Sequence, residues 1–89
     1  MFFTYIIENQ DGIFYKGSTA DFNERLVQHN KGLSTYTKNR GPWKLIFVAS
    51  FETRKEAEEL ERKLKRCNKK YLRWLILQPV NIKNKELDR

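Results

Sequence analysis

The stretch TYIIENQDGIFYKGST, residues 4–19, decides how the fold begins. Apolar and aromatic residues alternate on both sides of Asp11 and Gly12, a pair typical of a tight turn between antiparallel strands. A two-residue turn would send Tyr5 and Tyr15 to opposite faces of the hairpin, because a shift of one residue reverses every side chain. A three-residue loop with Gly12 in the left-handed bulge position would place both rings on one face. We predict the three-residue loop.

A helix is predicted next, over residues 22–30. Asp21 followed by Glu24 has the spacing of a capping box, and Gly32 is placed to end the helix. The polar stretch KGLSTYTKNRGPW, residues 31–43, is long for a loop, and such loops are often functional. The run LIFVA at 45–49 is typical of a strand covered on both faces, which we expect to be the central strand of the sheet.

Two more helical segments follow this strand. Thr53 and Glu56 form a second capping box that opens a helix through about Arg66. A third segment begins near Lys69 and ends before Pro79, because proline cannot continue a helix. The predicted order is therefore β-β-α-β-α-α, and a small three-stranded sheet with helices packed on it is an α+β fold.

The length and cysteine content bound the possibilities. A chain of 89 residues allows one domain, which we place at 1–81 with a polar tail at 82–89. The single Cys67 cannot form an internal disulfide, and no cysteine and histidine have the spacing of a zinc site. The first seven residues are too short an apolar run for a signal peptide or a membrane span, which favours a cytoplasmic location.

The charge indicates an anionic partner. The formal net charge is +7 and the isoelectric point is near 9.7, and nucleic acid is favoured over a membrane surface. Seven of the twelve residues at 62–73 are cationic. This run is equally consistent with a solvated helix face carrying i,i+4 pairs such as Glu58/Arg62, Glu59/Lys63 and Glu61/Lys65, and with phosphate contacts.

Glu61 is the acidic residue that periodicity singles out. At 100° per residue it points only about 40° from Ala57, inside the apolar stripe that Leu60 and Leu64 complete. A carboxylate at such a position needs a cation ligand, a basic partner or an edge position that reaches water. From the pattern alone, an edge glutamate paired with Lys65 is the simpler interpretation and is favoured over a metal ligand, since structural ion pairs are common.

Arg25 and His29 lie four residues apart on the first predicted helix, so both can reach one groove. Neither residue alone defines a site, because a single helical arginine is usually solvated and a single histidine is usually a hydrogen-bonded boundary residue. Tyr5 and Tyr15 are, by themselves, ordinary strand aromatics.

Taken in order, these residues resemble the GIY-YIG nuclease family. TYII at 4–7 stands for the first motif, and FYKGST at 14–19 stands for the second. ADFNERLVQHNKG at 20–32 matches the helix that carries the catalytic arginine and a frequent histidine, here Arg25 and His29. EAEELERKLKR at 56–66 matches the helix with the metal-binding glutamate, here Glu61. The chain looks most similar to the minimal single-domain branch, related to the incision domain of bacterial excision-repair proteins.

The resemblance implies hydrolysis of phosphodiester bonds with one divalent cation, Mg²⁺ or Mn²⁺, held by Glu61 and water. Arg25 would offset charge in the transition state, and either Tyr5 or Tyr15 would help to deprotonate the attacking water. Ser18 stands where some relatives have an assisting lysine. The late asparagine of the family falls at Asn81, further from Glu61 than the pattern expects.

The resemblance also implies a nucleic-acid partner, with DNA favoured over RNA, a repair or processing role, and room for a targeting protein as a further partner. We expect cations and one ring from the second motif, the long loop and the third strand to contact it: Lys16, Lys38, Arg40, Trp43 and Lys44. Two rival functions stay open. One is a nucleic-acid-binding module without cleavage, which would use the loop aromatics for stacking. The other is a protein-interaction adaptor, which would expose apolar residues such as Tyr71, Trp74 and Leu75.

Overall fold

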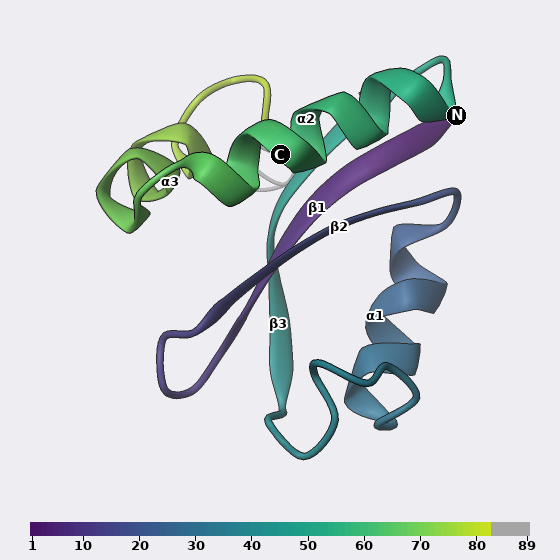
Figure 1. The fold of residues 1–89 in the computed structure, drawn as a ribbon, viewed down its shortest axis with the longest axis vertical. Helices are drawn as coiled ribbons and strands as arrows, with labels where there is room; N and C mark the ends of the chain where they lie inside the picture. The colour runs from purple at the N-terminus through teal and green to yellow at the C-terminus, as the bar shows by residue number, and fades with distance from the viewer. Residues whose placement is uncertain (83–89) are drawn as a thin grey trace.

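The computed structural model describes residues 1–82 and confirms the predicted order of elements. A three-stranded antiparallel sheet carries helices on both faces, so the α+β class is also confirmed (Figure 1). The elements are β1 (Phe2–Asn9), β2 (Phe14–Thr19), α1 (Phe22–Asn30), β3 (Trp43–Phe51), α2 (Arg54–Arg66) and α3 (Lys69–Ile76).

The first hairpin has the predicted three-residue loop. Tyr5 pairs with Gly17 and Ile7 pairs with Tyr15, which puts both tyrosines on one face of the sheet. Gly12 has a φ of 78°, a left-handed conformation that glycine adopts without strain. The side chain of Asn9 fixes the loop, because its Oδ1 accepts hydrogen bonds from the backbone N–H groups of residues 11 and 13.

The sheet order is β2-β1-β3, so the central strand is β1, and our placement of the third strand at the centre was wrong. The apolar run in β3 reflects burial on both faces, since Leu45 and Phe47 pack into different clusters on opposite sides of the sheet. The free edge of β3 is covered by the buried Asn81. Its Oδ1 accepts from the Val48 N–H and its Nδ2 donates to the Ile46 carbonyl. An edge strand that is buried on both faces thus has the same unbroken apolar sequence as a central strand.

The two faces of the sheet carry different helices (Figure 1). On one face, α1 covers a cluster built on Tyr5, Ile7 and Trp43. On the other face, α2 and α3 cover a cluster that includes Ile6 and Phe47. Because successive strand residues alternate between these layers, β1 supplies core to both.

The predicted residues cap the starts of α1 and α2, although the reciprocal capping box forms at α2 and not at α1. The Asp21 side chain accepts from the Glu24 N–H at the start of α1, and Thr53 and Glu56 form the full reciprocal capping box of α2. Of the i,i+4 pairs considered along α2, Glu61–Lys65 is the one formed among the described residues.

Ile82 packs against the α1-side cluster, so the first residue of the predicted tail contacts the core. Residues 83–89, the rest of that tail, lie outside the described part of the chain. Within residues 1–82, no helix combines the length and the apolar character needed to cross a membrane.

Candidate active site

Tyr5, a fully buried side chain, anchors a hydrogen-bonded chain on the α1 face. Its hydroxyl lies 2.8 Å from Nε2 of His29, and Nδ1 of His29 lies 2.7 Å from Oγ1 of Thr37. Thr37 also donates to the backbone carbonyl of Ser34. A threonine hydroxyl has only one proton, so Thr37 accepts from a protonated Nδ1 of His29. Nε2 is then the acceptor, and Tyr5 donates its proton to it.

Both buried groups are held in their neutral forms. Burial, and after it the neighbouring Tyr15, raise the pKa of the Tyr5 phenol to about 12, against the opposing effect of Arg25. Burial and then the positive charge of Arg25 lower the pKa of His29 to about 4. At neutral pH Tyr5 is therefore a hydrogen-bond donor, and His29 is an uncharged acceptor.

A glycine on β2 makes room for the Tyr5 ring. A Cβ atom built on Gly17 would lie 2.5 Å from the Tyr5 hydroxyl oxygen and 2.7 Å from its Cζ. Glycine in a strand usually weakens it, and here the close approach of the phenol explains the residue.

We predict that Gly17→Ala will displace the Tyr5 ring and lower the free energy of unfolding by about 1–3 kcal/mol, the usual cost of overpacking. Denaturant unfolding would measure this, and the near-ultraviolet circular dichroism of the tyrosines should change as well. Ser50→Ala, an exposed position on β3, is the control. An unchanged stability for Gly17→Ala would mean that the ring has space to spare.

Arg25 approaches the same cluster from α1. Its Nη1 donates to Oε1 of Gln28 at 2.8 Å and its Nη2 to Oγ of Ser34 at 3.4 Å. These contacts hold the guanidinium beside Tyr5 and His29, whose pKa values both respond to it. Arg25 and His29 therefore reach one site, as their spacing predicted.

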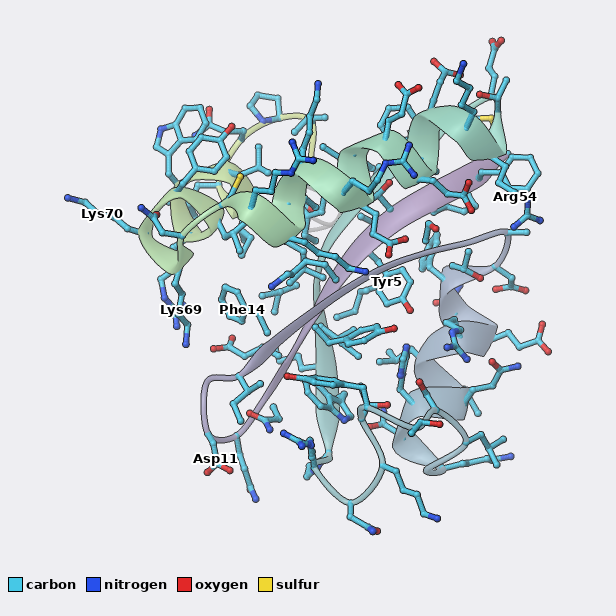
Figure 2. The ribbon with its side chains drawn as sticks, in the orientation of Figure 1. Tyr5, Asp11, Phe14, Arg54, Lys69 and Lys70 are labelled. Carbon is cyan, nitrogen blue, oxygen red and sulfur yellow. The ribbon has the colours of Figure 1, made fainter. Side chains whose placement is uncertain are left out.

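Tyr15 lines an open groove of about 240 Å³ at the edge of β2, with Phe14, Lys16, Tyr36 and Lys65. The rings of Tyr15 and Tyr5 are 6.4 Å apart between centroids, and those of Tyr15 and Tyr36 are 5.5 Å apart. Figure 2 shows Tyr5 between the strands and α1. Tyr15 is half-buried, so it joins the buried chain of Tyr5 to the groove.

Glu61 reaches this region from the opposite layer. Its Oε2 lies 2.8 Å from Nζ of Lys65, and its Oε1 accepts a 2.7 Å hydrogen bond from the Ser18 hydroxyl on β2. Its side chain is 20% exposed, which makes it a boundary residue paired as the simpler interpretation predicted. Ser18 was not expected as a partner. The tyrosines and Glu61 thus lie on different faces of the sheet, and β2 is the strand whose edge separates them.

A metal ion held at Glu61 would have few protein ligands. Among residues 1–82, no three side chains of His, Cys, Asp or Glu gather into a group that could hold a metal ion. Mg²⁺ commonly keeps several waters and takes one or two carboxylates together with substrate phosphates. Both oxygens of the Glu61 carboxylate have protein partners, Ser18 at Oε1 and Lys65 at Oε2, so a bound ion would take the place of the Lys65 ammonium. Glu61 could accordingly hold such an ion with water.

Three of the remaining predicted residues lie elsewhere. Trp43 is only 3% exposed and its indole N–H donates to the Thr37 carbonyl, so our expectation that it contacts nucleic acid was wrong. Lys44 is exposed on β3, across β1 from the groove-lining strand. Asn81 is fully buried and its amide is bonded to the edge of β3, which is a structural role.

Two of the residues predicted to contact nucleic acid lie in the loop between α1 and β3. Lys38 and Arg40 are both exposed, and the Arg40 guanidinium lies 4.8 Å over the Tyr36 ring. This ring also contacts Tyr15, so Arg40 is connected to the groove through Tyr36.

Gly17 and Thr37, which fix the positions of Tyr5 and His29, were absent from the sequence prediction. Gly17 carries a usable signal, because a glycine in the middle of a strand indicates a close approach. Thr37 carries none, since a threonine in a polar loop gives no sign that it will be buried against a histidine.

The neutral His29 makes stability depend on pH. Its pKa is about 4 in the folded protein and 6.5 as a free side chain, so between these values the unfolded chain binds more protons. We expect stability to be full above about pH 6.5 and to fall as the pH is lowered to about 4, by on the order of 3 kcal/mol from this residue. Thermal melts across this range would measure the loss. In His29→Gln the pH dependence should be flatter, and an equal slope in both proteins would contradict the assignment.

The comparisons with known proteins identify the family to which this small α+β domain belongs. The model of the GIY-YIG catalytic domain matches residues 1–73, and the chain belongs to this family, which is a family of nucleases. This covers every residue of the site described above.

The similar proteins are small bacterial proteins of the UPF0213 group. The chain is 37% identical to UPF0213 protein YazA of Bacillus subtilis over 82 residues, 91% of this chain and 83% of the relative. It is 39% identical to UPF0213 protein lwe0147 of Listeria welshimeri over 69 residues, 76% of this chain and 77% of the relative. The solution structure of UPF0213 protein BH0048 from Bacillus halodurans aligns with a TM-score of 0.58 at 30% identity, covering 90% of this chain and 87% of that one.

Proposed function

We propose that this protein is a metal-dependent endonuclease that hydrolyses phosphodiester bonds in nucleic acid, with DNA as the favoured substrate and repair or processing as its role. The observation that carries the proposal is the convergence at β2. Tyr5, Tyr15, His29 and Arg25 meet on one side of this strand, and Glu61 meets it from the other. A surface that only bound nucleic acid would not need a carboxylate beside the groove, because a carboxylate repels phosphates.

The polar groups then divide into two sets. Glu61 would hold one Mg²⁺ or Mn²⁺ ion, and the ion, when bound, would polarise the phosphate and stabilise the leaving oxygen. Arg25 would place a fixed positive charge where the phosphoryl oxygens gain negative charge, and it needs no reorganisation because Gln28 and Ser34 already hold it.

We assign Tyr15, and not Tyr5, as the general base that helps to deprotonate the attacking water. A pKa of about 12 and a hydrogen bond to His29 keep the proton on Tyr5. Tyr15 faces the groove, where a water can reach it, and geometry is the first requirement for a general base. Tyr5 would instead position Tyr15 by packing against it.

The test is a cleavage assay with magnesium and then with EDTA, on single-stranded, duplex, flapped and branched DNA and on RNA of the same sequences. Cleavage of at least one substrate that EDTA stops is the expected result. If every substrate is bound but none is cleaved with Mg²⁺ or with Mn²⁺, the result would favour the second candidate, a nucleic-acid-binding module. That candidate draws support from the Lys65 ammonium, which already neutralises Glu61.

Arg40 is expected to act in binding. Arg40→Gln should weaken DNA affinity and reduce the slope of log affinity against log salt by about 0.9, the value for one duplex phosphate contact. Arg54→Gln is a matched control, because its guanidinium also lies over an aromatic ring, Phe2 at 4.9 Å, at the start of α2. Anisotropy titrations at several salt concentrations would measure both variants. An equal loss of slope in the two would assign the effect to net charge rather than to the groove.

A further inference from the structure

The outer face of α3 carries two exposed aromatic rings. Tyr71 is 46% exposed and Trp74 is 54% exposed. Their ring centroids are 5.5 Å apart at an interplanar angle of 35°. The same helix buries Leu72 in the core, so its orientation is fixed and the rings are held in solvent by the packing behind them. A preformed aromatic pair of this kind offers flat surface without the entropic cost of ordering flexible side chains.

The segment of chain that carries these rings has charged residues of one sign only. Residues 62–82 contain seven Lys and Arg and no Asp or Glu. Lys65 and Arg73 form ion pairs with Glu61 and Glu8, which are the two ion pairs among residues 1–82. Lys70 takes part in neither of these ion pairs, and Figure 2 shows it pointing away from the molecule while Lys69 extends beside Phe14. An anionic partner complements this surface.

The surface of α3 that carries Tyr71, Trp74 and Lys70 is continuous with the groove. Phe14 lines the groove, and the cationic groups of Lys69 and Arg73 lie over its ring at 4.8 and 5.1 Å. At 100° per residue, Lys70 and Trp74 follow Arg73 around α3. A strand that leaves the groove across Phe14 would therefore meet these cations first and the aromatic pair next.

We propose that α3 is a second nucleic-acid contact surface that binds an unpaired strand next to the cleavage groove. Tyr71 and Trp74 stack on its bases, and Lys70 contacts its phosphates. A stacked aromatic pair selects a single strand because every unpaired base exposes a π face, whereas a duplex presents mainly phosphates to such a surface. The position of the strand relative to the groove rests on the proposed function, but binding to α3 does not require cleavage.

The two tryptophans make the test direct, because Trp43 is buried and Trp74 is exposed. The protein is titrated in EDTA with an oligothymidylate and an oligouridylate of about 20 nucleotides, and tryptophan emission is followed. We expect quenching of Trp74 emission by both strands, and little quenching by a duplex of equal length. Trp74→Leu, which keeps an apolar side chain, should lose the quenching and weaken binding by about tenfold, measured by anisotropy of a labelled strand.

Lys70→Gln should reduce the salt slope for the single strand by about 0.7. Leu77→Ser, an apolar residue 75% exposed just beyond α3, is the control and should leave single-strand affinity unchanged. Tyr71→Leu repeats the test on the second ring if Trp74→Leu does not fold.

Unchanged affinity in Trp74→Leu and Tyr71→Leu would overturn the proposal. So would equal quenching by single strand and duplex, or a concentration-dependent dimer in sedimentation that Trp74→Leu abolishes, which would assign the face to a second copy of the chain. Failure of the nuclease function gives a different result, namely loss of cleavage on every substrate with Trp74 quenching retained.

Discussion

Glu61→Gln is expected to abolish magnesium-dependent cleavage and to leave the fold nearly as stable as before. A neutral amide is a far poorer ligand for a hard cation than a carboxylate. The loss of several kcal/mol of charge stabilisation corresponds to a rate lower by on the order of a thousandfold. The ion pair that disappears joins Glu61 to a Lys65 side chain that is 55% exposed, so its removal should cost at most about 1 kcal/mol.

Two further variants make this result specific. Glu61→Leu should also be inactive, and its stability should be close to that of the parent, because Glu61 lies beside the apolar stripe that Ala57, Leu60 and Leu64 form on α2. Glu59→Gln, an exposed carboxylate two positions away, should change neither activity nor melting temperature. Mn²⁺ binding followed by electron paramagnetic resonance gives a readout independent of turnover. An active Glu61→Gln protein would refute the metal-site proposal.

Arg25→Ala should reduce turnover about a hundredfold to a thousandfold, the usual effect of removing one preorganised group that stabilises transition-state charge. The Michaelis constant should change little, because a contact made mainly in the transition state contributes little to ground-state binding. Single-turnover kinetics with saturating enzyme would separate the two effects.

Lys31→Gln is the control for Arg25, because Lys31 is an exposed cation at the C-terminal end of the same helix. Arg25 also bonds Gln28 and Ser34, so a melt of each variant must accompany the kinetics. Intact turnover with collapsed affinity would show that Arg25 acts in binding and not on the transition state.

Local chemistry explains why much of the fold could be predicted. The hairpin register follows from the conformational preference of Gly12, which the sequence displays directly. The starts of α1 and α2 follow from side chains within three residues of each cap. The meeting of Tyr5 and Tyr15 follows in turn, because strand alternation carries the register to every side chain.

Long-range contacts account for what sequence reasoning did not find. The apolar run in β3 indicates two buried faces, but it does not reveal which strand lies beside it. The sequence places Trp43 at the end of a basic loop, where an aromatic residue could stack on a base. In the structure its ring lies in the core instead, and its indole N–H donates to the Thr37 carbonyl. The bond between Ser18 and Glu61 joins residues 43 positions apart, and no local pattern encodes such a contact.

The amide of Asn81 bears on where this domain ends. The match to the family stops at residue 73, but the bonds from Asn81 to residues 46 and 48 close the open side of β3. A shortened protein that stopped at the family boundary would expose unpaired backbone groups along an apolar strand, which is a template for polymerisation. We therefore expect a protein truncated after residue 73 to associate through the exposed edge of β3 more readily than the full chain does.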